Sequence, residues 1–129
     1  MDPIADMLTS LRNAAAVRRA SIVVPYSGVK ARIAELLLQH SYLEAVREQN
    51  DEGKRSLELV LSYLGDTPAI RSIRRLSTPG LRLYRKATDL PKPRGGFGIV
   101  VVSTPHGLMT TDQARRTRTG GELICEVLS

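Results

Sequence analysis

The chain has 129 residues, of which 42% are hydrophobic, and a formal net charge of +6. A chain of this length buries roughly two-thirds of its unfolded surface, enough for one domain or for two small lobes with a shared core. Its single cysteine excludes an internal disulfide framework, and no apolar run approaches the roughly 20 residues of a membrane-spanning helix. Because the acidic start lacks the basic region of a signal peptide, we expect a soluble, cytosolic protein that does not bind a membrane.

The positive charge is concentrated in the second half of the chain. Residues 1–70 hold eight Lys or Arg against nine Asp or Glu, a net charge of −1, whereas residues 71–129 hold eleven against four, a net charge of +7. A field of that sign favours binding to a polyanion such as nucleic acid. On charge alone, the alternative is a basic domain that is merely soluble.

The first predicted elements are a helix and a short strand. Asp2-Pro3 is typical of a helix start, with an N-cap aspartate followed by proline at the first helical position. From Ile4 onward, apolar residues recur at intervals of four, three and four, which places them on one helical face. Residues 21–25 then indicate a strand that ends at Pro25.

A second helix is predicted to begin after Ser27, which can act as its N-cap. We expect Lys30 and Arg32 to lie off its apolar face. The histidine at the end of this helix is interpreted as a partner for the helix dipole rather than as a catalyst. The apolar face is predicted to hold Val29, Ile33, Leu36, Leu37 and His40.

A hairpin and a linker are predicted next. Residues 42–47 and 55–63 are expected to pair around the turn at residues 50–53. Residues 65–68, Gly-Asp-Thr-Pro, break the pattern where the charge changes, and we therefore predict a linker there. The chain is divided accordingly into an N-terminal α/β lobe at residues 1–64, with the order helix, strand, helix, strand, strand, and a C-terminal lobe at residues 69–129.

The C-terminal lobe begins with two segments, residues 69–75 and 81–84, on either side of Pro79-Gly80. That dipeptide suits a type II turn. A stiff proline-rich loop at residues 89–94 then leads to Gly95-Gly96-Phe97-Gly98. The apolar run at residues 99–102, bounded by this glycine-rich segment and by a turn, predicts a buried strand.

The chain is predicted to close with a short helix and a last strand. Thr110 and Gln113 have the spacing of a capping box, which predicts a helix over residues 111–118 that Gly120 would stop. Residues 122–128 alternate in a way that suits a strand. One of its faces is expected to hold Leu123, Cys125 and Val127, and the other Glu122, Ile124 and Glu126. The predicted fold class is α+β, with a C-terminal lobe of mainly antiparallel strands and one short helix.

The residues give little support to catalysis, and no cofactor is predicted. Gly95-Gly96-Phe97-Gly98 could cradle a phosphate, but this loop lacks the lysine and hydroxyl of a P-loop. Ser103 has no base except His106, which lacks an orienting carboxylate, and no spacing typical of metal ligands occurs. A small phosphate-binding enzyme using the glycine loop is therefore the weaker alternative. A basic lobe that docks an acidic protein is a third.

The composition favours folded RNA over single strands. The chain has one Phe, four Tyr and no Trp, too few for the aromatic platform on which single-stranded RNA is usually stacked. A folded helix would instead be read by its shape, phosphates and 2′-hydroxyls. Glu122 fits such a surface only if it pairs with an arginine or accepts a proton from a base amine. Hydrogen bonds and close backbone approach are expected from Ser103, Thr104, Thr117, Thr119, Gly120 and Gly121.

Several motifs occur in the order found in one known family. They are Asp2-Pro3-Ile4-Ala5-Asp6-Met7-Leu8, Val24-Pro25-Tyr26-Ser27, Ser77-Thr78-Pro79-Gly80-Leu81-Arg82, Gly95-Gly96-Phe97-Gly98-Ile99, Ser103-Thr104 with Gly107-Leu108-Met109-Thr110, and Gly120-Gly121-Glu122-Leu123-Ile124-Cys125-Glu126-Val127. Over nearly its whole length the chain resembles the bacterial-type ribosomal protein S-eight family, the eighth protein of the small subunit. Pro105 departs from the family, which commonly has a serine there, and it removes a hydroxyl and a backbone N–H.

The resemblance implies a structural, non-catalytic protein of the small ribosomal subunit, in a cytoplasmic or an organellar ribosome. It implies direct binding to a stem in the central domain of the small-subunit ribosomal RNA, neighbouring ribosomal proteins as partners, a role in assembling the platform, and in some bacteria repression of the protein's own operon through its messenger RNA. Phosphate contacts are also expected from Arg115, Arg116 and Arg118. The RNA-binding residues that we predict are Ser103, Thr104, Gly120, Gly121, Glu122, Tyr84, Arg115, Arg116, Thr9, Asn13 and Lys30.

Overall fold

The computed structural model describes residues 2–129 and contains two main antiparallel sheets and three α-helices. The helices are α1 (Pro3–Ala16), α2 (Gly28–Gln39) and α3 (Thr111–Arg116). The first sheet has the order β1 (Ser21–Pro25), β3 (Lys54–Leu61), β2 (Leu43–Asp51). The second has the order β6 (Ser72–Arg75), β10 (Gly121–Leu128), β8 (Gly98–Thr104), β9 (Gly107–Thr110), and β7 (Tyr84–Arg85) also pairs with β10.

Shorter elements connect these strands. The hairpin of β4 (Tyr63–Leu64) and β5 (Thr67–Pro68) lies between the two sheets in the chain, and the 3-10 turns η1 (Ala87–Asp89) and η2 (Arg94–Gly96) connect β7 to β8 within the second sheet. No helix of the described residues is long and apolar enough to cross a membrane. The predicted α+β class, with its order of elements and its single short C-terminal helix, is confirmed.

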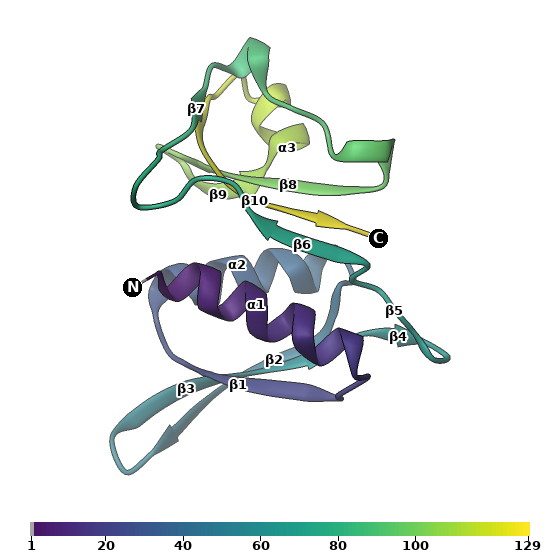
Figure 1. Ribbon diagram of the computed structural model, residues 1–129. Coiled ribbons are helices and arrows are strands. Elements are labelled where there is room, and N and C mark those ends of the chain that lie inside the picture. The colour runs from purple at the N-terminus through teal and green to yellow at the C-terminus, as the bar shows by residue number, and fades with distance from the viewer. Residues whose placement is uncertain (1) are drawn as a thin grey trace.

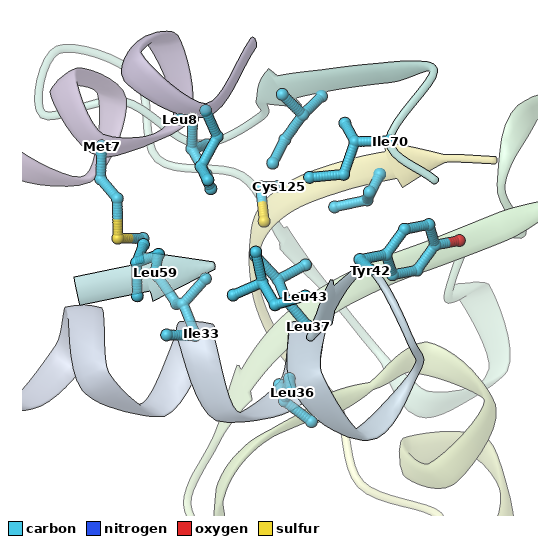
Figure 2. Close-up of a cluster of buried hydrophobic side chains, with 14 of the residues drawn as sticks. Met7, Leu8, Ile33, Leu36, Leu37, Tyr42, Leu43, Leu59, Ile70 and Cys125 are labelled. Atoms are coloured by element: carbon cyan, nitrogen blue, oxygen red, sulfur yellow. The ribbon is translucent and has the colours of Figure 1, made fainter. Parts of the chain in front are cut away.

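The elements form four layers, which Figure 1 shows from the side. The helices α1 and α2 lie between the two sheets, and α3 covers the far face of the second sheet. One large apolar cluster fills the space around α1 and α2. In Figure 2, Cys125 of β10 lies among Leu8 of α1, Leu37 of α2 and Leu43 of β2. A smaller cluster between the second sheet and α3 contains Leu90, Val100, Val102, Ala114 and Leu123.

The large cluster joins both halves of the chain. Ile73 and Val101 of the second sheet belong to the same cluster as the side chains of α1 and α2. Residues 65–68, predicted as a linker, form the turn and the second strand of the small β4–β5 hairpin. The division into lobes at residues 1–64 and 69–129 stays a prediction.

The predicted helix starts are confirmed. The Asp2 carboxylate accepts a hydrogen bond from the backbone N–H of Ala5, and Pro3 occupies the first turn. Ser27 caps α2 in the same manner through the backbone N–H of Lys30. At α3, Thr110 and Gln113 form both halves of a capping box.

The predicted apolar face of α2 is partly wrong. Lys30 is only 5% exposed, whereas Val29 is 39% exposed and His40 is exposed. Residues 30, 33, 34 and 37 share one face, so the buried stripe is rotated from the predicted one. A lysine can occupy a buried stripe because its four-carbon stem packs against apolar atoms while its ammonium reaches solvent.

All three helices end in a left-handed residue that is not glycine. Arg18, Ser41 and Arg118 have φ angles of 57°, 66° and 53°. After each of them the next residue returns a backbone hydrogen bond to the helix, as Thr119 N–H does to the Ala114 carbonyl, which is the Schellman arrangement. The prediction that Gly120 stops the last helix is therefore wrong, since Arg118 already reverses the chain.

Two other expectations about turns and strands need correction. Pro79-Gly80 does form a turn, closed by hydrogen bonds between Thr78 and Leu81, but the φ of Gly80 is not positive, so the turn is not type II. The predicted hairpin of the first sheet is longer than expected because positive φ angles at Glu52 and Gly53 allow a two-residue turn. The strand β9, which pairs with β8, was not predicted from the sequence.

A β-bulge in β10 overturns the predicted alternation of the last strand. Leu123 pairs with Val102, and the register then shifts so that Cys125 pairs with Val101. Because of this shift, the side chains of residues 125–128 lie on the opposite faces from those that simple alternation after Leu123 would give. Glu122 therefore lies on the face of the second sheet that looks toward α1 and α2, and Glu126 lies on the opposite face.

Glu126 binds the loop before β8 to the sheet. Its carboxylate is 4% exposed and accepts hydrogen bonds from Arg74 Nε at 2.9 Å, from Arg94 Nε at 3.0 Å and from the Arg94 backbone N–H at 3.0 Å. Burial raises the pKa of Glu126, but these hydrogen bonds and the arginine charge outweigh it and lower the pKa below its ordinary value. The carboxylate therefore stays ionised.

Replacing Ser41 by glycine is expected to raise the free energy of unfolding by about 0.5 to 1 kcal/mol, because glycine adopts a left-handed conformation without the steric cost that serine has. Ala16→Gly is the matched control. It removes a small exposed side chain inside the last turn of α1 and should lower stability by about 1 kcal/mol. Urea unfolding followed by circular dichroism measures both. Destabilisation by Ser41→Gly would contradict a left-handed conformation of Ser41.

Glu126→Gln is expected to lower stability at neutral pH and to flatten its dependence on acid. Because the folded-state pKa of Glu126 is lowered, its contribution is present above the unfolded-state pKa and is lost as the pH falls through the folded-state value. Thermal unfolding from pH 7 down to pH 3 measures this. The control is Glu52→Gln in the exposed β2–β3 turn, and equal pH profiles for the wild type and Glu126→Gln would refute the role of this carboxylate.

Candidate nucleic-acid interface

Three of the predicted RNA-binding residues form a row across the second sheet. Tyr84 of β7 pairs with Glu122 of β10, which pairs with Ser103 of β8. Directly opposed residues of an antiparallel sheet point to the same face, so the three side chains are neighbours. Tyr84 is 65% exposed, and Ser103 and Glu122 are half-buried. We call Tyr84, Glu122 and Ser103 the polar row.

Glu122 is paired with an arginine that the sequence analysis did not single out as a contact. Arg82 Nη1 lies 3.1 Å from its carboxylate. Burial raises the pKa of Glu122. Hydrogen bonds from Ser77 and Arg82 and the charges of Arg82 and Arg75 outweigh burial, so the pKa lies below its ordinary value. The ionised Glu122 thus orients Arg82 beside the polar row. Pairing with an arginine is one of the two roles that the sequence predicted for Glu122.

Ser103 and Thr104 are neighbours in β8, but their hydroxyls have different surroundings. Thr104 is buried, and its Oγ1 donates to the Gly107 carbonyl at 2.8 Å and accepts from the His106 backbone N–H at 3.1 Å. Its hydroxyl is therefore used within the β8–β9 turn. Ser103 makes no side-chain hydrogen bond to residues 2–129 and is half-buried, so its hydroxyl is available to a ligand. Pro105, beside them, is exposed at the tip of the turn.

Gly120 and Gly121 are required by the protein's own backbone. A Cβ on Gly121 would collide with the carbonyl oxygen of Ser103, and one on Gly120 would collide with that of Arg85. The two glycines let β10 start between β7 and β8 at this corner. They bring the polar row together, and the close approach that the sequence suggested is made to the chain itself.

Arg115 and Arg116 do not join the polar row. They lie on α3, which packs on the other face of the sheet through Ala114. Arg115 is largely engaged inside the protein, since it donates to the Leu90 carbonyl at 3.1 Å and pairs with Asp112. Arg116 is exposed and lines a groove of about 490 Å³ between α2, β9 and α3.

The three predicted residues of the N-terminal half lie along α1 and α2. Thr9 and Asn13 are exposed on α1, and Asn13 lines a cavity of about 620 Å³ beside β1. Lys30 lines a second cavity of about 350 Å³, formed by the first turns of α1 and by β1, which also contains Asp6 and Ser10. These residues form a surface separate from the polar row.

The glycine-rich loop has a structural explanation. Gly95 and Gly96 have φ angles of 74° and 81°, which form the tight turn before β8. A Cβ on Gly98 would collide with the carbonyl oxygen of Val127. Among residues 2–129, no group of three or more His, Cys, Asp or Glu side chains is placed to hold a metal ion. Cys125 is buried, and burial raises its pKa to about 12.

The chain matches proteins of one family along nearly its whole length. A family model described as Ribosomal protein S8 matches residues 2–128. A protein named small ribosomal subunit protein uS8 from Cupriavidus metallidurans is 47% identical over 126 residues, which cover 98% of this chain and 96% of that protein. Proteins with the same name from Albidiferax ferrireducens and Acidithiobacillus ferrooxidans are 44% and 46% identical over the same shares.

The α+β fold, the basic polar surface and these relatives together define a structural protein of the small ribosomal subunit rather than an enzyme. Within that class, the chain belongs to the ribosomal protein S8 family. The family resemblance of the sequence is thereby confirmed, and the alternative of a phosphate-binding enzyme is set aside. The RNA-binding roles of individual residues stay predictions.

Thr104→Ala and Ser103→Ala are expected to separate structural from available hydroxyls. Thr104→Ala removes two hydrogen bonds of the β8–β9 turn and should cost about 1 to 2 kcal/mol of stability. Ser103→Ala removes a hydroxyl without an internal partner and should change stability by less than about 0.5 kcal/mol. Chemical denaturation measures both. Equal losses would show that Ser103 is also structural.

Proposed function

We propose that the protein binds directly to a stem in the central domain of the small-subunit ribosomal RNA and that the C-terminal half, residues 69–129, makes the main contacts. The observation that carries the proposal is the polar row, where an available hydroxyl, an exposed aromatic ring and an oriented arginine share one face of a rigid sheet. Membership of a small-subunit family supports RNA as the ligand.

The chemistry of the row suits the minor groove of a folded RNA. The Ser103 hydroxyl can donate to or accept from a 2′-hydroxyl or a base edge, and Tyr84 offers a flat ring to a sugar or a splayed base. Arg82 supplies a positive charge beside them. The polar row offers one guanidinium group and few free hydrogen-bond donors, so it can make few contacts to base edges. Because phosphate contacts position a protein without specifying bases, we expect the row to recognise the shape of the RNA more than its sequence.

The other predicted contacts have supporting roles. Gly120, Gly121 and Thr104 shape the corner from within, while Thr9 and Asn13 extend the polar surface over α1. Lys30 is 5% exposed and can contribute only through the cavity that it lines beside β1. Arg116 contributes to the general field. Neighbouring small-subunit proteins are the further partners that we propose, and the binding of this protein helps to assemble the platform around the stem.

The same surface can also bind messenger RNA. A protein that recognises a stem by shape and 2′-hydroxyls binds any RNA that presents the same shape. We therefore propose that a stem of like structure in the messenger RNA of the protein's own operon, where one exists, competes with ribosomal RNA for the polar row and represses translation.

The test is a salt-titrated binding assay with the central-domain stem, using a perfect RNA duplex of equal length as competitor. The wild type should prefer the stem by at least about a hundredfold, roughly 2.7 kcal/mol. Ser103→Ala and Tyr84→Ala should each reduce that preference about fivefold or more with unchanged thermal unfolding. The control is Arg47→Gln on the outer face of the first sheet. Equal affinity for both RNAs would overturn the proposal and would leave the basic half as a general polyanion-binding surface.

A further inference from the structure

A second organised cluster of charges lies on the opposite face of the second sheet from the polar row. There, Arg74 and Arg94 both donate through Nε to the same carboxylate oxygen of Glu126, at 2.9 and 3.0 Å. Since both guanidiniums touch one atom, they lie side by side. Arg74 comes from the edge strand β6 and Arg94 from η2, so the buried carboxylate brings together two arginines that are distant in the sequence.

The outer ends of these two arginines are free. Their Nη1 and Nη2 atoms make no hydrogen bond to residues 2–129, and the side chains are 47% and 60% exposed. An arginine held by Nε still offers its two Nη groups in a fixed plane, which is the geometry that binds phosphate oxygens. Glu126 neutralises only one of the two charges, so the cluster keeps a net positive charge at the surface.

The fold does not need two arginines here for neutralisation. One arginine would balance the single charge of Glu126, and the backbone N–H of Arg94 already donates to its second oxygen. The second guanidinium adds positive charge to a half of the chain that carries +7. Self-repulsion of that kind is costly unless an anion offsets it.

We propose that the Arg74–Arg94 pair is a phosphodiester-binding site for RNA, separate from the polar row. This inference rests on the proposed function, because it takes RNA as the ligand. Glu122 and Glu126 are four residues apart in β10, roughly 13 Å, and face opposite sides of the sheet. One short stem on the polar row does not reach both faces, so the phosphate belongs to a second RNA segment of the folded central domain.

RNA fits this site better than an acidic protein segment does. Arg71, three residues before Arg74, and Lys92, two residues before Arg94, are also exposed, so further positive charge lies close to the pair in the sequence. Within residues 2–129, Glu126 is the only acidic group that binds the pair, and it is buried and neutralised by the two arginines. An RNA backbone carries one negative charge per nucleotide, so it can contact several of these positive groups at once. A protein would do so only if it carried an unusually dense run of carboxylates.

The test uses Arg74→Lys and Arg94→Lys, singly and together. Lysine keeps the positive charge beside Glu126 but has one nitrogen, so it cannot pair with the carboxylate and also present a second fork. Arg47→Lys is the matched control, since Arg47 pairs with Glu58 at 2.9 Å on the first sheet. Binding is measured to the isolated central-domain stem and to a longer fragment containing the whole folded domain, with thermal unfolding of every variant.

The double lysine variant should bind the isolated stem as the wild type does and should bind the longer fragment at least about fivefold more weakly. Arg74→Gln, which keeps Arg94 on Glu126, should in addition reduce the salt slope for the longer fragment by about 0.7 to 0.9. Unchanged affinity of the double variant for the longer fragment would overturn the inference and leave the polar row intact. If the wild type does not bind the isolated stem, the proposed function is refuted, and the inference that rests on it is refuted as well.

Discussion

The structure depends on β10, a central strand that is buried on both faces. It lies between β6 and β8, with α1 and α2 packed against one face and α3 against the other. Residues 123–128 are all buried because both faces of the sheet are covered. The bulge between Leu123 and Cys125 decides which face each side chain takes, and Arg75 stabilises it by donating to the Ile124 carbonyl at 3.0 Å while pairing with Asp2, the N-cap of α1. The bulge thus links the second sheet to the first helix.

The same bulge separates the two glutamates of β10. Glu122 faces the side of α1 and α2 and holds Arg82, while Glu126 faces the other side and holds Arg74 and Arg94. In a half of the chain with few acidic groups, each carboxylate fixes arginines that would otherwise lose several rotamers on binding. For the RNA ligand that we propose, these carboxylates would lower the entropic cost of binding, because they already hold the guanidinium groups in place.

The sequence predicted the elements better than their environment. Local chemistry determines a helix start, so Asp2, Ser27 and the Thr110–Gln113 box could be identified without the fold. A bulge, a buried lysine stem and a left-handed arginine depend on what packs against them, and no local pattern marks Ile124, Lys30 or Arg118 in advance. Non-glycine residues at left-handed positions cost about 1 kcal/mol each, so tertiary contacts must hold the chain there.

The candidate site shows the same limit at the level of single groups. Similarity to the family identified Ser103, Thr104 and Gly121 together, but only coordinates show that the Thr104 hydroxyl and the Gly121 backbone are used within the protein, while the Ser103 hydroxyl is free. A residue can thus support the proposed RNA surface through its contacts within the protein. Because Thr104 and Gly121 fix the β8–β9 turn and the start of β10, a change at either moves Ser103 and Glu122 together, and binding would fall through geometry rather than through a lost contact.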